Sequence, residues 1–182
     1  MLRNLALIFA LAASPALATS LQIDVQGEAN GTITIELDEA NAPLSAARLA
    51  ELAREGAYDG VVFHRVIDGF MAQTGDVQFG RSGGNLAMAG TGGSNLPDLP
   101  AEFSSVPFER GVVGMARSQN PNSANSQFFI MFDAAPHLNG QYTVVGHVTS
   151  GLDVLDRIKR GDPRTGAVAE FPDMMAQVRV ED

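Results

Sequence analysis

Three short runs of the chain, residues 61–66, 70–74 and 127–132, alternate like β-strands and carry polar side chains among apolar ones. Because successive side chains of a strand point to opposite faces, each run has one face that mixes the two kinds. The mixed faces are Val61, Phe63 and Arg65, then Met71 and Gln73, then Gln127, Phe129 and Met131. An apolar floor with a few polar groups is the composition of a ligand groove, although an ordinary barrel exterior gives the same pattern.

The other faces and residues suggest no competing chemistry. The opposite face of the third run is wholly apolar and typical of a core: Phe128, Ile130 and Phe132. The three histidines, His64, His137 and His147, lack the spacing of a metal site. The sequence contains no G-x-S-x-G motif at a turn from an expected strand into an expected helix, the turn that carries the nucleophilic serine in many hydrolases. The segment Gly90–Ser94 lacks the Gly-Lys-Ser/Thr of a phosphate loop, and the sole lysine is Lys159. We therefore expect neither a metal nor a cofactor.

Length and composition predict one globular domain. The chain has 182 residues, no cysteine and a formal net charge of −9. The absence of cysteine excludes a disulfide scaffold, a thiol nucleophile and a cysteine-ligated metal. The negative charge argues against a nucleic-acid partner, which requires a basic surface.

The first 18 residues, MLRNLALIFALAASPALA, have the pattern of a signal peptide. A positive start precedes a short apolar run, and Ala16-Leu17-Ala18 forms an A-x-A cleavage site. The run is about half the ~20 residues that a membrane-spanning helix needs. A buried N-terminal helix is the alternative. We expect an exported, periplasmic protein with no membrane contact after cleavage, and a domain covering residues 19–182.

Two helices and a hairpin frame the predicted strands. Asn30-Gly31 predicts a hairpin between Leu21–Val25 and Thr32–Leu37. A helix is predicted over Ala42–Gly56, with Pro43 in its first turn. Its inner stripe is Ala46, Leu49, Ala50 and Ala53, and Arg48, Glu51 and Glu55 point to solvent. A second helix is predicted over Gly151–Arg160, closed by Gly161.

About eight short strands with two helices predict a mainly β fold, an antiparallel barrel or sandwich with helices over its ends. The strand runs after the hairpin are Val61–Val66, Phe70–Thr74, Gly111–Ala116, Gln127–Phe132, Thr143–Val148 and Ala176–Val180. The stretch Gly80–Glu109 has no periodicity, and its role stays open.

Several blocks of the sequence resemble the cyclophilin-type peptidyl-prolyl isomerases. Residues 63–76, FHRVIDGFMAQTGD, are similar to the family signature FHRxIxxFMxQxGD. Residues 126–130, SQFFI, match a second block, and residues 111–116 and 144–148 resemble two further strands of the family. The blocks occur in the family's order across nearly the whole predicted mature chain.

The resemblance implies a closed eight-stranded antiparallel barrel capped by two α-helices. It also implies cis–trans isomerisation of X–Pro bonds, which interconvert slowly enough to limit folding. In this reaction no bond is made or broken, so the resemblance implies no cofactor. The implied partners are proline-containing unfolded or partly folded polypeptides, and we expect a monomer because no interface helix or heptad is seen.

The resemblance also assigns roles to individual residues. Arg65 matches the family's catalytic arginine, and Gln73 matches the glutamine that orients it and touches the peptide. The pocket for the proline ring is Phe70, Met71, Phe129 and Leu138. The positions that bind the flanking backbone are Ala116, Arg117 and Gln127, and Tyr142 stands where the family often has a polar ring.

Three positions depart from the family pattern. Asp68 stands where proline is common, and Arg117 replaces the usual asparagine and adds charge to the groove wall. His137 occupies the position where eukaryotic members carry a tryptophan associated with tight cyclosporin binding, so we do not expect strong inhibition here.

Two functions of different classes remain. One is a prolyl isomerase that assists the folding of exported proteins, with Arg65 stabilising the twisted transition state. The other is a non-catalytic chaperone or scaffold module that binds proline-containing segments. Intact Arg65 and Gln73 favour the isomerase, because a binder does not need the arginine.

Overall fold

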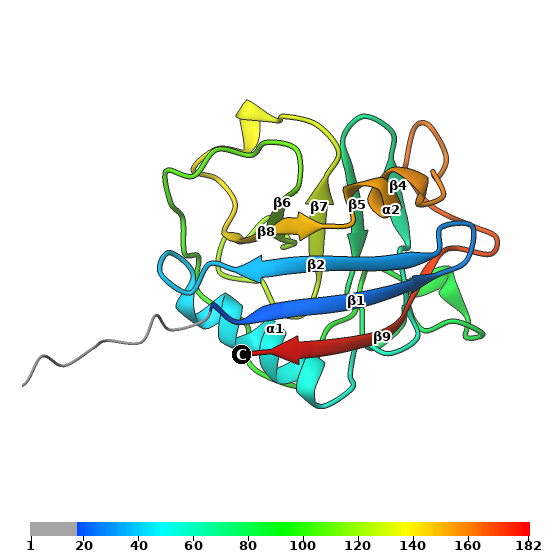
Figure 1. The fold of residues 1–182 in the computed structure, drawn as a ribbon, viewed down its shortest axis with the longest axis horizontal. Coiled ribbons are helices and arrows are strands. Elements are labelled where there is room, and N and C mark those ends of the chain that lie inside the picture. Colours follow the sequence, from blue (N-terminus) through cyan, green and yellow to red (C-terminus); the bar gives the residue numbers. More distant parts are fainter. Residues whose placement is uncertain (1–17) are drawn as a thin grey trace, which may run out of the picture.

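The computed structural model describes residues 18–182, which form a curved β-sheet with a helix at each of two opposite ends (Figure 1). The predicted signal segment, residues 1–18, lies outside the described residues except for Ala18. In chain order the strands and helices are β1 (Ser20–Gln26), β2 (Gly31–Leu37), α1 (Pro43–Arg54), β3 (Val61–Val62), β4 (Arg65–Ile67), β5 (Met71–Thr74), β6 (Val112–Met115), β7 (Phe128–Met131), β8 (Val144–Ser150), α2 (Leu152–Arg157) and β9 (Met174–Glu181). Among residues 18–182, no helix has the length and apolarity to cross a membrane.

Over residues 18–182 the fold is mainly β with two α-helices, as predicted, but the sheet is a nine-stranded open half-barrel rather than a closed eight-stranded barrel. Its hydrogen-bonded order is β3-β9-β1-β2-β8-β6-β7-β5-β4. Both edge strands come from the predicted run Val61–Val66, which breaks at Phe63 and His64. At the break, Phe63 donates its N–H to the carbonyl of Asp173, and the carbonyl of His64 accepts from Val168. The two halves pair with β9 and β5, so no ladder joins them.

The break also changes which side chains share a face. Phe63 is fully buried in the main core together with Val61 and Val66. Arg65 is partly exposed on the other side of the sheet. The predicted common face of Phe63 and Arg65 is therefore wrong, because strict alternation holds only where the chain is continuously extended.

The N-terminal hairpin forms as its Asn-Gly turn predicts. Ile23 lies opposite Ile33, and Leu21 lies opposite Ile35. All four side chains have 0% exposure and fill the inside of the sheet. The last strand, β9, pairs with the other edge of β1, so the two ends of the described chain lie side by side (Figure 1).

Helix α1 packs its predicted apolar stripe against the sheet. Pro43 lies in its first turn, and Gly56 follows its end with a φ of 67°. The buried stripe is Ala46, Leu49, Ala50 and Ala53. Arg48, predicted to face solvent, is instead only 8% exposed. Its burial arises because the segment around Pro97 covers this side of the helix and accepts a hydrogen bond from it.

A carboxylate distant in the sequence caps the start of α1. The residue before the helix, Ala42, has no side-chain capping bond. Glu102 accepts the N–H groups of Leu44 and Ser45, both at 2.8 Å, and the Ser45 hydroxyl at 2.6 Å. These bonds satisfy donors that a helix N-terminus leaves free. The stretch Gly80–Glu109 is thus anchored to α1.

Helix α2 is shorter than the predicted Gly151–Arg160. It ends at Arg157, because Ile158 leaves the helical conformation with a ψ of 129° and is 1% exposed. The next N–H, of Lys159, donates to the buried Asp173 carboxylate at 2.6 Å. Packing of Ile158 into the core and this hydrogen bond end the helix before Gly161 is reached.

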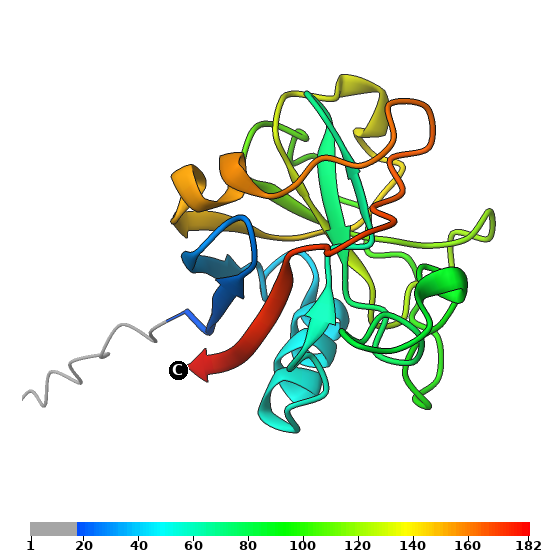
Figure 2. The same ribbon diagram turned by 90° about the vertical axis from the view of Figure 1, so that its right-hand side faces the viewer.

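The long stretch after β5 is fastened by one buried carboxylate. Asp76 has 0% exposure, and its oxygens accept backbone N–H groups from Gln78, Phe79, Gly90 and Gly92. Such bonds replace the water that a buried charge loses. Figure 2 shows this segment, drawn in green, at one side of the sheet beside α1.

Two apolar clusters lie on the two faces of the sheet. The main core contains the apolar face predicted for the third run: Phe128, Ile130 and Phe132. The alternate side chains Met71, Phe129 and Met131 belong to a second cluster with Leu138. The predicted separation of these two faces is confirmed, and the second cluster forms the base of the site described next.

Candidate active site

A cavity of about 210 Å³ lies over the second apolar cluster. Nine of the eleven residues expected from the sequence line it: Arg65, Phe70, Met71, Gln73, Ala116, Arg117, Phe129, Leu138 and Tyr142. The other two, Gln127 and His137, lie close by. Gln127 lines an adjoining cavity, and His137 stacks on Phe70 with ring centroids 5.8 Å apart.

Arg65 is held at the rim of this cavity from two sides. It lies opposite Gln73 in the β4–β5 register, and its Nη1 donates to Gln73 Oε1 at 3.3 Å. On the other side its Nε donates to the carbonyl of Thr165 at 3.2 Å. Nη1 also lies 3.9 Å from the sulfur of Met71. A guanidinium is a permanently charged, pure donor, so these contacts fix the direction of its remaining N–H groups.

A chain of amide hydrogen bonds continues from Gln73 across the site. Gln73 Nε2 donates to Gln127 Oε1 at 3.0 Å, and Gln127 Nε2 donates to the carbonyl of Gly92 at 2.8 Å. Gly92 is itself fastened by Asp76. Each amide is oriented by its neighbours, so the arginine and the loop after β5 are parts of one network.

The cavity base is aromatic and tightly packed. Phe129 stacks on Phe108 with centroids 5.8 Å apart, and Tyr142 meets Phe129 edge-on at 5.8 Å. A Cβ on Gly114 would lie 2.4 Å from the Phe129 ring. Glycine at this position of β6 therefore leaves the space that Phe129 occupies.

Arg117 forms one wall and joins two loops. Its Nη2 donates to the carbonyl of Gln141 at 2.8 Å, and its Nη1 donates to that of Ser118 at 2.9 Å. Its guanidinium carbon lies 4.2 Å from the centre of the Tyr142 ring, a cation–π contact. With Arg65 it places two cations at the cavity of an acidic protein.

A second cavity, of about 500 Å³, adjoins the first. The two share Gln73, Ala116 and Arg117, so together they form one groove. The second cavity is lined mainly by the polar segment Gly90–Ser94 with Asp98, Ser123 and Asn125. These residues are not among those expected from the sequence. Asn125 stands two positions before Gln127, so strand alternation would place both on the same face.

His64, next to Arg65 in the chain, is a buried histidine. It is 7% exposed, and neither ring nitrogen has a hydrogen-bond partner within residues 18–182. Burial lowers the pKa of His64, and the nearby Asp76 carboxylate partly opposes this shift. No group of three or more histidine, aspartate or glutamate side chains in the described part of the chain could hold a metal ion.

The sequence matches a family model over residues 21–180, that of the cyclophilin type peptidyl-prolyl cis-trans isomerase/CLD. The chain belongs to this cyclophilin family. A protein of Brucella suis named "Probable peptidyl-prolyl cis-trans isomerase" is 60% identical over 154 residues, 84% of this chain and 79% of that protein. A Helicobacter pylori peptidyl-prolyl cis-trans isomerase is 41% identical over 136 residues, 72% of this chain and 77% of that protein.

Solved cyclophilin structures have the same fold. A cyclophilin of Hirschia baltica superposes with a TM-score of 0.72 at 26% identity, over 88% of this chain and 73% of that one. A Cryptosporidium parvum cyclophilin studied in the presence of the dipeptide Ala-Pro has a TM-score of 0.75 at 23% identity, over 90% and 99% of the two chains. Family and relatives together make this cyclophilin a peptidyl-prolyl cis–trans isomerase.

Proposed function

We propose that Arg65 catalyses rotation about the X–Pro bond by stabilising its twisted transition state. The barrier, about 18–20 kcal/mol, comes from resonance between the prolyl nitrogen and the preceding carbonyl. Twisting the bond returns the lone pair to the nitrogen, which then accepts a hydrogen bond. The guanidinium of Arg65, fixed by Gln73 and Thr165, donates there. An interaction made only in the twisted state lowers the barrier.

The smaller cavity accepts the proline ring. Its base is formed by Phe129, Met71 and Leu138, which are all under 9% exposed. Proline has no backbone N–H, so its ring enters an apolar pocket without leaving a donor unpaired. The pocket then holds the ring while the preceding carbonyl rotates.

The groove continues beyond the proline pocket into the larger cavity. The shared residues Gln73, Ala116 and Arg117 connect the two volumes. A client chain whose proline occupies the smaller cavity therefore extends past them. Polar side chains such as Asn125 and Asp98 are available to its backbone and side chains. The proposed clients are proline-containing unfolded or partly folded polypeptides.

Isomerase assays on an X–Pro peptide test this role of Arg65. Replacing a preorganised donor in the transition state costs about 10²–10³ in rate, so Arg65→Ala is expected to lose activity on that scale. Arg157, an exposed arginine of α2 paired with Asp153, provides the matched control Arg157→Ala. A folded Arg65→Ala with wild-type activity rejects the mechanism. If that variant also binds peptide normally and complements a deletion strain, the binding-module hypothesis is favoured.

We further propose that the chain is exported to the periplasm and acts there as a monomer. Support comes from the signal-like pattern of residues 1–18. Cleavage after Ala18 leaves Thr19, whose carbonyl bonds to the N–H of Leu37, at the new N-terminus. Expression in a Gram-negative host followed by fractionation and N-terminal sequencing tests this. A cytoplasmic protein that retains Met1 rejects it, and sedimentation measures the oligomeric state.

A further inference from the structure

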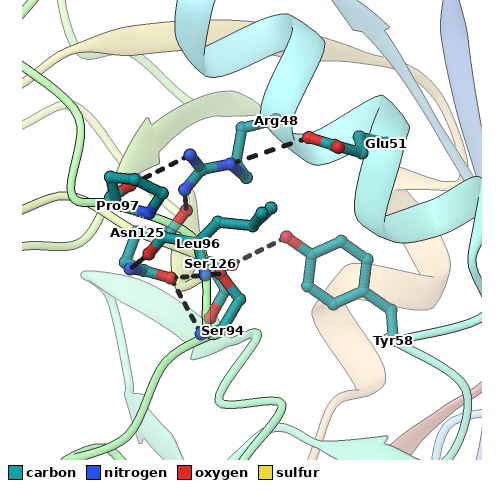
Figure 3. Close-up of polar contacts among 8 residues, drawn as sticks. All are labelled: Arg48, Glu51, Tyr58, Ser94, Leu96, Pro97, Asn125 and Ser126. Carbon is teal, nitrogen blue, oxygen red and sulfur yellow. Dashed lines mark hydrogen bonds and ion pairs between the residues drawn. The ribbon is translucent and has the colours of Figure 1, made fainter.

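Arg48 is a buried arginine on α1 that lines neither cavity of the groove. Only 8% of it is exposed, and its nearest carboxylate, that of Glu51, lies 4.0 Å away and is half-exposed (Figure 3). Its short contacts are to main-chain carbonyls, with Nη2 donating to Pro97 at 2.9 Å and Nη1 to Asn125 at 3.4 Å. Burying a charged group costs free energy unless its N–H donors are hydrogen-bonded. The folded protein therefore favours the positions of the two segments in which their carbonyls accept hydrogen bonds from Arg48.

Those segments also meet each other through the side chain of Asn125. Its Oδ1 accepts the N–H of Ser94 at 2.8 Å and the Ser94 hydroxyl at 2.7 Å. Its Nδ2 donates at 3.0 Å to the carbonyl of Leu96 and to Asp98 Oδ1. Residues 94–98 are thus held by Asn125 on one side and by Arg48, through Pro97, on the other (Figure 3).

Tyr58, which follows α1, adds a neighbouring tether. Its hydroxyl donates to the carbonyl of Ser126 at 2.8 Å (Figure 3). Burial strongly raises the pKa of Tyr58, against a smaller lowering by the charge of Arg48, so the phenol keeps its proton and remains a donor. Arg48 and Tyr58 therefore bind two successive carbonyls, those of Asn125 and Ser126. The next residue, Gln127, lines the groove.

The wall supported in this way belongs to the larger cavity. Ser94, Asp98 and Asn125 line it, and residues 90–98 contain no helix or strand. Without a hydrogen-bonded ladder, the position of such a segment depends on side-chain anchors. Arg48 itself lines neither cavity of the groove.

We propose that Arg48 is a positioning residue that holds this wall in place and so determines how strongly residues flanking the X–Pro pair contribute to client binding. The inference rests on the two-cavity groove of the proposed function. Arg48 acts through the carbonyls of Pro97 and Asn125, and it does not line the smaller cavity, where Arg65 and the proposed site of the client's proline lie. Its effect is therefore specific to clients long enough to reach the larger cavity.

The test compares a long and a short substrate on the same variants. The substrates are a blocked Ala-Pro dipeptide and a blocked hexapeptide containing the same Ala-Pro pair, both followed by NMR exchange. Arg48→Met loses the hydrogen bonds of a charged donor. We expect the ratio of kcat/KM for the hexapeptide to kcat/KM for the dipeptide to fall about tenfold in this variant, mainly through a higher KM for the hexapeptide. Arg48→Lys keeps the positive charge but not the planar set of guanidinium N–H donors, so its hexapeptide-to-dipeptide ratio is expected to lie between those of the wild type and Arg48→Met. Arg54→Met is the control, since Arg54 lies on the same helix and pairs at the surface with Asp182.

Each outcome decides the proposal. A folded Arg48→Met with the wild-type ratio overturns it, as does an equal loss on both substrates. If Arg48→Met does not fold, Arg48→Lys decides in its place, and a wild-type ratio in that variant overturns the proposal. A wild-type protein inactive on both substrates is a failure of the proposed function and not of Arg48.

Discussion

At the scale of single residues, the site depends on side chains that orient one another. Gln73 accepts from Arg65 and donates to Gln127, so one amide orients both the guanidinium of Arg65 and the amide of Gln127. An amide has a donor end and an acceptor end, and only one of its two orientations satisfies both neighbours. The direction of Arg65 is therefore a property of the network and of the Thr165 carbonyl, as well as of β4.

His64 predicts a pH dependence of stability. Burial lowers its pKa in the folded protein below the ordinary value of 6.5, so the unfolded chain binds a proton more readily. The free energy of unfolding should therefore fall as the pH drops below about 6.5 and level off below the folded-state pKa. Asp76 and Arg65 are the charged neighbours, with opposite effects on this pKa. Denaturant unfolding from about pH 8 to about pH 5 measures it. His64→Gln should flatten the dependence, and an equally steep curve in this variant contradicts the assignment.

At the scale of elements, residues distant in the sequence complete what local sequence leaves unsatisfied. Helix α1 has no capping side chain of its own and receives the carboxylate of Glu102. The loop after β5 has no regular structure over most of its length and is fastened by Asp76 and Asn125. Helix and loop therefore stabilise each other, and the groove wall is attached to both.

Glu102→Ala is expected to destabilise the protein by about 1–2 kcal/mol, since a capping acceptor and a favourable charge at a helix N-terminus are both lost. Denaturant unfolding measures the change. Glu109→Ala provides the control, because Glu109 is exposed in the same stretch and caps no helix. Equal stabilities of the two variants would show that the cap contributes nothing.

At the scale of the whole molecule, the sheet joins the core to the groove. The main core lies on its inner face, and the second cluster, with Phe129, lies under the smaller cavity of the groove. Residues of β6 and β7 contribute to both clusters through strict alternation, as Phe128 and Phe129 show. A change in packing between these strands therefore reaches the active site.

Gly114→Ala tests how far the packing of the second cluster determines the site above it. The added Cβ would lie 2.4 Å from the Phe129 ring and 2.7 Å from that of Phe108, so the rings must move. Overpacking of this kind costs about 1–3 kcal/mol of stability, and the displaced Phe129 should also raise KM for X–Pro peptides. Unfolding and isomerase kinetics measure the two effects. A variant that is destabilised but has wild-type kinetics would show that the packing of Phe129 does not determine substrate binding.

Local patterns alone determined much of this protein. Strand alternation separated Phe128 from Phe129, the Asn-Gly turn located the first hairpin, and the motif around Arg65 indicated the family. These features depend on residues within a few positions of one another, where side-chain periodicity and turn geometry operate.

Contacts between distant parts of the chain determine the remaining features. They split the run 61–66 between two partner strands, end α2 early, and bury Arg48 under a segment almost fifty residues away. An amphipathic pattern shows which side of a helix faces the sheet, but not which distant loop covers the remaining sides. The family motif around Arg65 could therefore be recognised in the sequence, whereas the wall of the larger cavity depends on contacts that form only when the whole chain has folded.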